Sequence, residues 1–360
     1  MRRWTSPALQ GLVLAAAVLL IALLPRFTSE FRLGQFTYVG IYFVALLGLN
    51  ILTGYNGQIS LGHAAFMGIG GYTAAVLILG RKGFELLGQH PSHVIPDHGM
   101  RAVFTIPIAG LVAGVIGCLF GIPALRLAGV SLALATLAVA VSFPSLAKRF
   151  EHLTGGGGGL SLPLPHAPFG WHISTPHWLY YEVWVSAGIL FVVAWLLVRG
   201  RVGRAWRAIR DGEIAAVSSG VSPAAYKTLA FGVSAAYAGV AGALFAIQVS
   251  YLNPDTFPVT LSILLLASVV IGGLSSLSGV IVGALVLEFL PIYAQAPPVL
   301  HLNFAKQASP VVFGVVLMLI VVLIPGGAAG LLRRVARPVR AASRKTPRSH
   351  GDSSASTSSP

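Results

Sequence analysis

The sequence has little charge for its length. Only 9% of its 360 residues are Asp, Glu, Lys or Arg, whereas 55% are hydrophobic and the mean hydropathy is +0.81. A soluble enzyme needs many more charged residues to cover its surface, so that class is nearly excluded. Intrinsic disorder is excluded for most of the chain because it requires low hydrophobicity.

The sequence also lacks the residues of a metal, nucleotide or catalytic site. Its only cysteine, Cys118, lies in an apolar run, so neither an intrachain disulfide nor a cysteine cluster is available. No glycine is followed by lysine, so there is no P-loop, and any ATP must be hydrolysed by another subunit. A proline-interrupted loop carries His90, His93, Asp97 and His98 without the helical spacing of a zinc motif. We therefore expect no metal, no cofactor and no catalytic residue.

Basic residues outnumber acidic ones, 24 to 10, which gives a net charge of +14. They lie between long apolar runs and near the C-terminus, with no stripe interleaved with aromatic residues. Nucleic-acid binding is therefore not expected. Control of membrane topology explains this distribution better.

Two runs with no charged residue or only one are too long for single membrane helices, since about 20 apolar residues cross a bilayer. Residues 33–80 contain no charged residue, and residues 256–305 contain only Glu288. LTGYNGQISLGH, at 52–63, interrupts the first run, and GGLSSLSG, at 272–279, interrupts the second. Glycine and serine clusters interrupt helices, so each run predicts two helices that meet at a break.

The remaining apolar runs complete a count of about ten spans. They are residues 9–24, 103–125, 127–147, 183–198, 228–250 and 311–324. The segment after residue 24, PRFTSE, has no small-residue cleavage site, so we favour an uncleaved first span over a signal peptide. The sequence predicts an all-α integral membrane protein of about ten transmembrane helices with broken or re-entrant segments.

Charge supports one orientation of these spans. With a cytoplasmic N-terminus, the C-terminus and the loop at about 199–227 are also cytoplasmic, and cytoplasmic segments then hold 16 Lys and Arg against 8 outside. Residues 1–332 form the expected permease domain. Residues 333–360 are basic and then Ser/Thr-rich, which predicts a disordered tail. Its basic residues are explained by control of topology, and contact with membrane lipid headgroups is the alternative.

The cytoplasmic segment 201–220 predicts an amphipathic helix. Apolar residues recur at i, i+4 and i+7, with arginines on the rest of the surface. The apolar stripe is Val202, Trp206 and Ile209, and the arginines are Arg204, Arg207 and Arg210. Periodicity leaves two interpretations open, a helix on the membrane surface and a helix in a groove of a partner.

Small residues indicate where membrane helices pack closely. Glycines four residues apart let backbones approach in lipid. These pairs are Gly110/Gly114, Gly117/Gly121 and Gly279/Gly283. They predict tight packing and say nothing of a substrate.

Several stretches, in order, resemble one transporter family. LTGYNGQISLGHAAFMGIGGYTAA, at 52–75, is the most specific, and three others are LRLAGVSLALATLA from residue 125, LTGGGGGLSLP from 153 and GGLSSLSGVIVGA from 272. A fourth, from residue 203, begins GRAWRAIRDGEIAAVSSG. Together they resemble the LivM branch of the branched-chain amino-acid ABC importer permeases over almost all of 33–331.

The resemblance implies a transport subunit of the bacterial inner membrane and not an enzyme. Glu213, Ala215, Ala216 and Gly220 resemble the family's EAA signature, a cytoplasmic helix that docks into an ATPase subunit. The coupling residues it implies are Arg204, Trp206, Arg207, Arg210, Glu213, Ala215, Ala216 and Gly220. The implied partners are a second, LivH-like permease subunit, two ABC ATPases and an extracytoplasmic solute-binding protein. Trp206→Asp or Glu213→Lys should then leave the chain inserted but lower ATPase assembly.

The implied substrate is a branched-chain amino acid or a related small amino acid or amide. The chain departs from the family at Val130, Ser131 and Leu132, so permeases for urea, amides or other small polar solutes are the alternative. An ion-coupled secondary carrier is disfavoured because Glu288 is alone in its run. An intramembrane enzyme is disfavoured because no nucleophile and base are paired.

The break at 54–62 is the candidate translocation route, because broken helices expose backbone dipoles suited to a zwitterion. Its candidate residues are Asn56, Gly57, Gln58, Ser60, Gly62 and His63. Helix packing is the alternative explanation for these residues.

Overall fold

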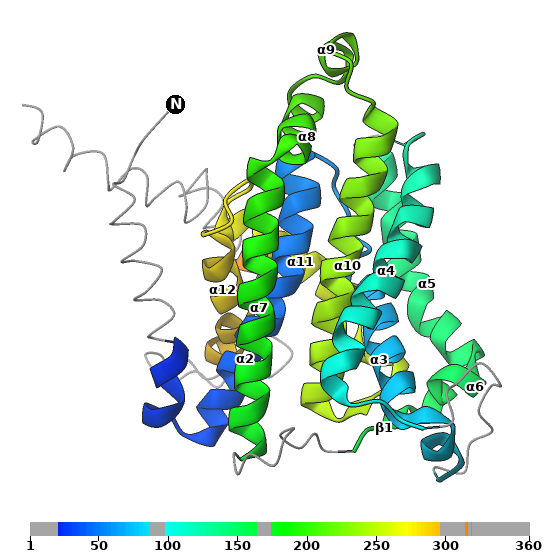
Figure 1. Cartoon of the computed structure of the whole chain (residues 1–360), viewed down its shortest axis with the longest axis vertical. Helices are drawn as coiled ribbons and strands as arrows, with labels where there is room; N and C mark the ends of the chain where they lie inside the picture. The colour runs from blue at the N-terminus through cyan, green and yellow to red at the C-terminus, as the bar shows by residue number, and fades with distance from the viewer. Residues whose placement is uncertain are drawn as a thin grey trace, which may run out of the picture.

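The computed structural model describes residues 21–86, 98–127, 129–163 and 174–295, with positions 314, 315 and 318 (Figure 1). Eight long or medium helices form a bundle. They are α2 (Glu30–Leu49), α3 (His63–Leu86), α4 (Ala102–Ala124), α5 (Val130–Arg149), α7 (Thr175–Arg199), α10 (Pro223–Val249), α11 (Val259–Gly272) and α12 (Val280–Gln295).

Short elements close the two ends of the bundle. At one end lie the π-helix η1 (Asn50–Tyr55), α8 (Arg201–Asp211) and α9 (Glu213–Ser218). The opposite end holds α6 (Glu151–Thr154), η2 (Gly156–Gly158), β1 (Leu160–Ser161), β2 (Tyr251–Leu252) and η4 (Pro254–Thr256).

Eight predicted spans correspond to helices of the structure. Within the described residues, seven helices are long and apolar enough to cross a membrane, and Val280–Tyr293 is a shorter apolar helix. The predicted spans 9–24 and 311–324 lie almost entirely outside the described residues, as do both termini and the tail 333–360. The all-α membrane architecture is therefore shown, whereas the count of ten remains a prediction.

One helix is longer than its apolar run. The span predicted at 183–198 begins at Thr175, where Pro176 occupies the first turn. Glu182 lies inside this helix and is only 6% exposed. Glu182 directly precedes the uncharged run 183–198, so hydropathy places it at the edge of a span and predicts Glu288 alone as an intramembrane carboxylate.

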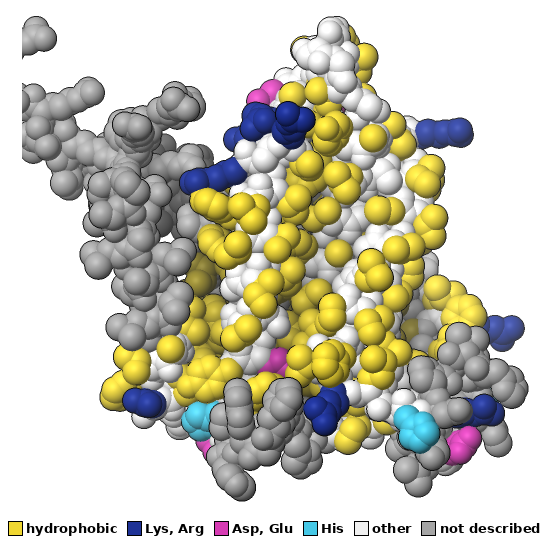
Figure 2. Space-filling view, in the orientation of Figure 1, with side chains coloured by type: hydrophobic (Ala, Val, Ile, Leu, Met, Phe, Trp, Pro, Cys, Tyr) yellow, Lys and Arg dark blue, Asp and Glu magenta, His cyan; other side chains and the backbone are white. Residues whose placement is uncertain are grey.

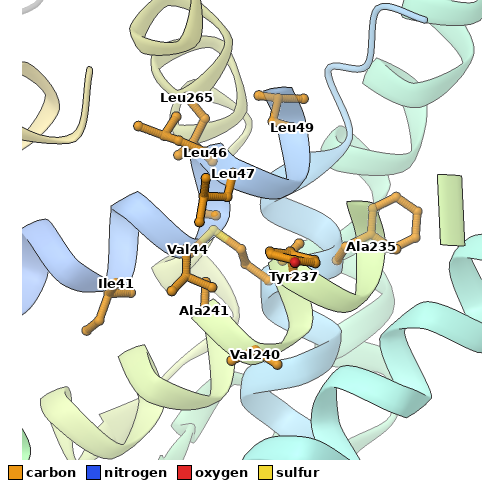
Figure 3. Packing of buried hydrophobic residues seen from close by; sticks show 14 of the residues in the cluster. Ile41, Val44, Leu46, Leu47, Leu49, Ala235, Tyr237, Val240, Ala241 and Leu265 are labelled. Atoms are coloured by element: carbon orange, nitrogen blue, oxygen red, sulfur yellow. The ribbon is translucent and has the colours of Figure 1, made fainter. Parts of the chain in front are cut away.

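The centre of the bundle is formed by α2 and α10. In each of them, 83% of an 18-residue apolar stretch is buried. Figure 3 shows Val44 and Leu47 of α2 beside Tyr237 and Ala241 of α10. Such packing in a lipid-soluble bundle depends on close van der Waals contact, since lipid tails are as apolar as the side chains.

Glycine permits a close approach between α4 and α10. A Cβ added at Gly114 would lie 3.1 Å from the Cβ of Ala236 and 3.3 Å from the carbonyl of Gly232. At Gly121 it would lie 3.2 Å from the Cβ of Phe231. The tight packing predicted from the glycine pairs of α4 is confirmed.

In the peripheral helices α4, α5 and α7, only about a third of the corresponding apolar stretch is buried. Their outer faces expose large apolar side chains such as Leu111, Leu134 and Ile189. Figure 2 shows hydrophobic side chains over the middle of the bundle and most Lys and Arg near its two ends. An apolar band between charged ends is the surface of a multi-pass membrane protein.

A two-stranded antiparallel pair departs from the expected all-helical fold. Leu160 pairs with Leu252 and Ser161 pairs with Tyr251, while Lys148 forms an ion pair of 3.0 Å with Asp255 nearby. The strands tie the chain after α6 to the chain after α10. They lie at the end of the bundle opposite α8 and α9 (Figure 1).

Candidate functional site

The predicted break in the first long run is confirmed. The chain of α2 continues into the π-helix, and helical structure resumes only where α3 begins at His63. Gly57 has a φ of +80°, a conformation that favours glycine. The amide of Gln58 donates to the carbonyl of Leu52 at 3.1 Å, and the hydroxyl of Thr53 donates to the carbonyl of Gln58 at 3.1 Å. These bonds replace part of the interrupted helical ladder.

The polar side chains of the break are buried. The Asn56 amide donates to the Gln58 Oε1 at 2.6 Å, and a ring nitrogen of His63 lies 2.9 Å from the carbonyl of Ala45. Ser60 Oγ accepts the amide of Gly62 at 3.3 Å. Of the four predicted side chains, Asn56 and Gln58 contact each other, Ser60 bonds the backbone of the break, and His63 bonds α2. The buried Oδ1 of Asn56 is the exception, because it has no hydrogen-bond partner among the described residues.

The end of the break packs on two helices that sequence analysis did not connect with it. A Cβ at Gly62 would lie 2.9 Å from the carbonyl of Thr136 in α5. The Thr136 hydroxyl accepts the amide of Leu61, and the Ser262 hydroxyl accepts the amide of Ala64, both at 2.9 Å. Single hydroxyls in apolar runs give no periodic signal, so Thr136 and Ser262 were missed.

The two predicted breaks meet each other. Asn50, fully buried in η1, accepts the amide of Ser275 at 3.0 Å and donates to the carbonyl of Ser276 at 3.1 Å. Ser275 has a φ of +62° in the turn between α11 and α12. Segments 225 residues apart therefore form one polar junction around Asn50. Asn50 and Ser275 were absent from the predicted site.

The apolar stripe of α8 faces its own chain. Trp206 is fully buried and its indole N–H donates to the carbonyl of Tyr226 at 2.9 Å. Ile209 is also buried, and Arg207 donates to the carbonyls of Gly203 and Val198. Trp206 and Ile209 are therefore covered by their own chain, an arrangement that neither interpretation included, and Trp206 has no exposed surface for a direct partner contact.

Helix α9 presents the opposite arrangement. It projects beyond the bundle, and Ile214 is 86% and Val217 54% exposed (Figure 1). Ala215 and Gly220 are also exposed, whereas Ala216 is buried. These apolar side chains stand at the tip of the molecule, outside the apolar band, which favours a protein partner.

The base of α9 is held by a charge pair. The carboxylate of Glu213 receives two hydrogen bonds of 2.7 Å from the ammonium of Lys227 in α10. Gly220, with a φ of +78°, turns the chain from α9 towards α10. The expected coupling residues therefore separate into an anchored part on α8 and a projecting part on α9.

An apolar bundle with two broken segments in contact and a projecting helix at one end is an arrangement that suits a membrane transport subunit. The chain belongs to the family described as the branched-chain amino acid transport system / permease component, whose model matches residues 32–323. This membership and the apolar helices make the chain a multi-pass protein of the bacterial inner membrane.

Several curated proteins are similar to the chain. The high-affinity branched-chain amino acid transport system permease protein LivM of Escherichia coli K12 is 34% identical over 310 residues, covering 78% of this chain and 69% of that protein. LivM of Salmonella typhimurium gives the same identity and coverage. The autoinducer 2 import system permease protein LsrC of Escherichia coli O9:H4 is 33% identical over 103 residues, 28% of this chain and 30% of its own length. No solved structure gives a significant match.

Proposed function

We propose that this permease moves branched-chain amino acids into the cytoplasm as the membrane-spanning subunit of an ABC importer. The similarity to LivM over most of both chains carries the substrate assignment. The absence of a P-loop from the sequence requires separate subunits for ATP hydrolysis. A second, LivH-like permease subunit, two ABC ATPases and an extracytoplasmic solute-binding protein complete the proposed assembly.

Docking of an ATPase is assigned to α9 and the exposed side of its junction with α8. The exposed apolar side chains of α9 suit insertion into a groove of the partner, as in helix-in-groove recognition. The ion pair between Glu213 and Lys227 links α9 to α10. A displacement of α9 is therefore transmitted to α10 at the centre of the bundle. Movement of α9 on closure of the ATPases then moves the permease helices.

An affinity-tagged chain tests this function. Purification from the native host should retain ATPase subunits, and membrane vesicles should take up tritiated leucine only with ATP and the binding protein. Competition by valine and isoleucine, but not by urea, amides or autoinducer 2, would support the substrate class. Uptake driven by an ion gradient without ATP would refute the importer and favour a secondary carrier.

The orientation is part of the proposal. With ten spans and a cytoplasmic N-terminus, α8 and α9 are cytoplasmic and the strand pair is extracytoplasmic. Single cysteines, introduced after Cys118→Ala, should react with a membrane-impermeant reagent from outside at Ser161 and only after permeabilisation at Arg204. Inside-only labelling at Ser161 would contradict the span count.

The break is proposed to line the translocation route. The buried Oδ1 of Asn56, which has no donor among the described residues, supports this role, because a buried acceptor without a donor is costly unless another group uses it. Asn56→Ala and Gln58→Ala should then lower uptake several-fold at unchanged membrane abundance. Gly62→Leu should lower abundance, because the Thr136 backbone fills the space. Full transport by both alanine variants would leave packing as the explanation.

A further inference from the structure

Arg210 lies on the polar side of α8, and its side chain reaches the junction of the two breaks. Its Nη1 donates to the carbonyl of Gly54 at 2.8 Å and to the hydroxyl of Ser275 at 2.6 Å. The Ser275 hydroxyl also donates to the carbonyl of Gly54 at 2.6 Å. The Arg210 guanidinium therefore links α8 to the π-helix η1 and to the turn between α11 and α12.

The π-helix supplies the acceptor. In a regular helix the carbonyl of Gly54 would accept the amide of Gln58, but that amide donates to Leu52 instead. Carbonyls left over at a helix end attract a cation, and the five donors of Arg serve several acceptors at once. Arg210 and Ser275 thus donate hydrogen bonds to the Gly54 carbonyl, which lacks its helical partner because the winding is irregular.

The side chain of Arg210 is held on both sides. Its Nε and Nη2 donate to the Asp211 carboxylate at 3.0 and 2.9 Å. A Cβ at Gly57 would lie 2.8 Å from Arg210 Cγ, so the break passes directly over the aliphatic stem. The Arg210 side chain is about one-third exposed, so solvent reaches it between these contacts.

The other arginines of α8 make no such bridge. Arg204 is exposed and donates, at 3.4 Å, to the carbonyl of Arg199 just before its own helix. Arg207 bonds carbonyls of Gly203 and Val198, on α8 and the end of α7. Among the described arginines of this helix, Arg210 alone contacts the broken segments.

We propose that Arg210 is a positioning residue that carries movement of α8 and α9 to the two breaks, so that ATP hydrolysis moves the translocation route. This rests on the proposed function, because α9 must first be moved by an ATPase. Arg210 touches neither ATP nor substrate in this assignment. It couples the two processes.

The test uses the whole importer, purified through a tag on this chain and reconstituted in proteoliposomes with binding protein. Arg210→Ala should retain the ATPases and hydrolyse ATP at near the wild-type rate, but take up about tenfold less tritiated leucine per ATP. Arg210→Lys, which keeps one donor for Gly54, should recover part of this loss. Arg201→Ala removes the same charge from the same helix, at an exposed position outside the proposed coupling residues, and should behave as wild type.

Ser275→Ala protects the test against misfolding of the arginine variant, because it removes only one hydroxyl from the junction. It should lower uptake per ATP about two- to threefold. Wild-type uptake per ATP in either Arg210→Ala or Ser275→Ala would overturn the positioning role. Loss of the ATPases from the unmutated complex would instead refute the proposed function, so the two failures are distinguishable.

Discussion

Helices α8 and α9 are neighbours in the chain, separated by Gly212, yet they use their apolar residues in opposite ways. Trp206 and Ile209 of α8 are buried against the bundle, whereas Ile214 and Val217 of α9 face outwards. The helix with the clearer amphipathic pattern is therefore the internal one. The short helix, whose pattern is too brief to read, carries the free apolar surface.

This difference shows what amphipathicity can and cannot establish. A stripe at i, i+4 and i+7 shows that one side of a helix must be covered, but not by which molecule. In α8 the covering residues come from the same chain, at the end of α7 and the start of α10. We infer that α8 transmits force and α9 receives it.

The largest effect is expected from Trp206→Asp. It places a carboxylate at a fully buried position and removes the bond to the Tyr226 carbonyl, a loss of about 3–5 kcal/mol or more. Membrane abundance should fall severalfold, which revises the sequence-based expectation of an inserted but uncoupled protein. Quantitative immunoblotting of membranes measures this.

Trp206→Phe is the matched control, since it keeps most of the packing and loses only the indole donor, about 1 kcal/mol. It should remain abundant. Normal abundance of Trp206→Asp together with loss of the ATPases would break the comparison, because it would put the stripe of α8 at the partner interface.

An intermediate effect is expected from Ile214→Asp. The side chain is 86% exposed, so membrane abundance should stay at the wild-type level. A charge in an apolar contact costs about 1–3 kcal/mol, so affinity for the ATPases should fall about tenfold or more. Pull-down of ATPase at graded concentrations measures it, with Ile214→Leu as the apolar control. Undiminished ATPase binding would remove α9 from the interface.

The smallest effect is expected from Glu213→Gln. The ion pair with Lys227 is half-exposed on the Glu213 side, and such pairs contribute at most about 1 kcal/mol. ATPase association should change no more than about twofold, and the difference should disappear at high salt. Glu213→Lys should act more strongly, because it repels Lys227 and loosens α9 from α10. Equal association for the wild type and Glu213→Lys would show that this pair does not orient α9.

The sequence alone determined the class, the approximate spans and the positions of both breaks. Those features depend on local composition: apolar length, missing charge, and clusters of glycine and serine at 52–63 and 272–279. Close packing of α4 was likewise predicted from its glycine spacing, since the same few residues that permit contact also form the pattern, but the partner helix α10 was not predicted.

Tertiary structure alone decided which surfaces those elements meet. That Asn50 joins Ser275, that Arg210 caps the carbonyl of Gly54, and that Trp206 is internal all depend on contacts between distant segments. Such contacts involve one side chain at each end and repeat with no period, so nothing in the neighbouring sequence marks them. Hydropathy predicts that a group must leave water or lipid, but only packing of the whole bundle selects its partner.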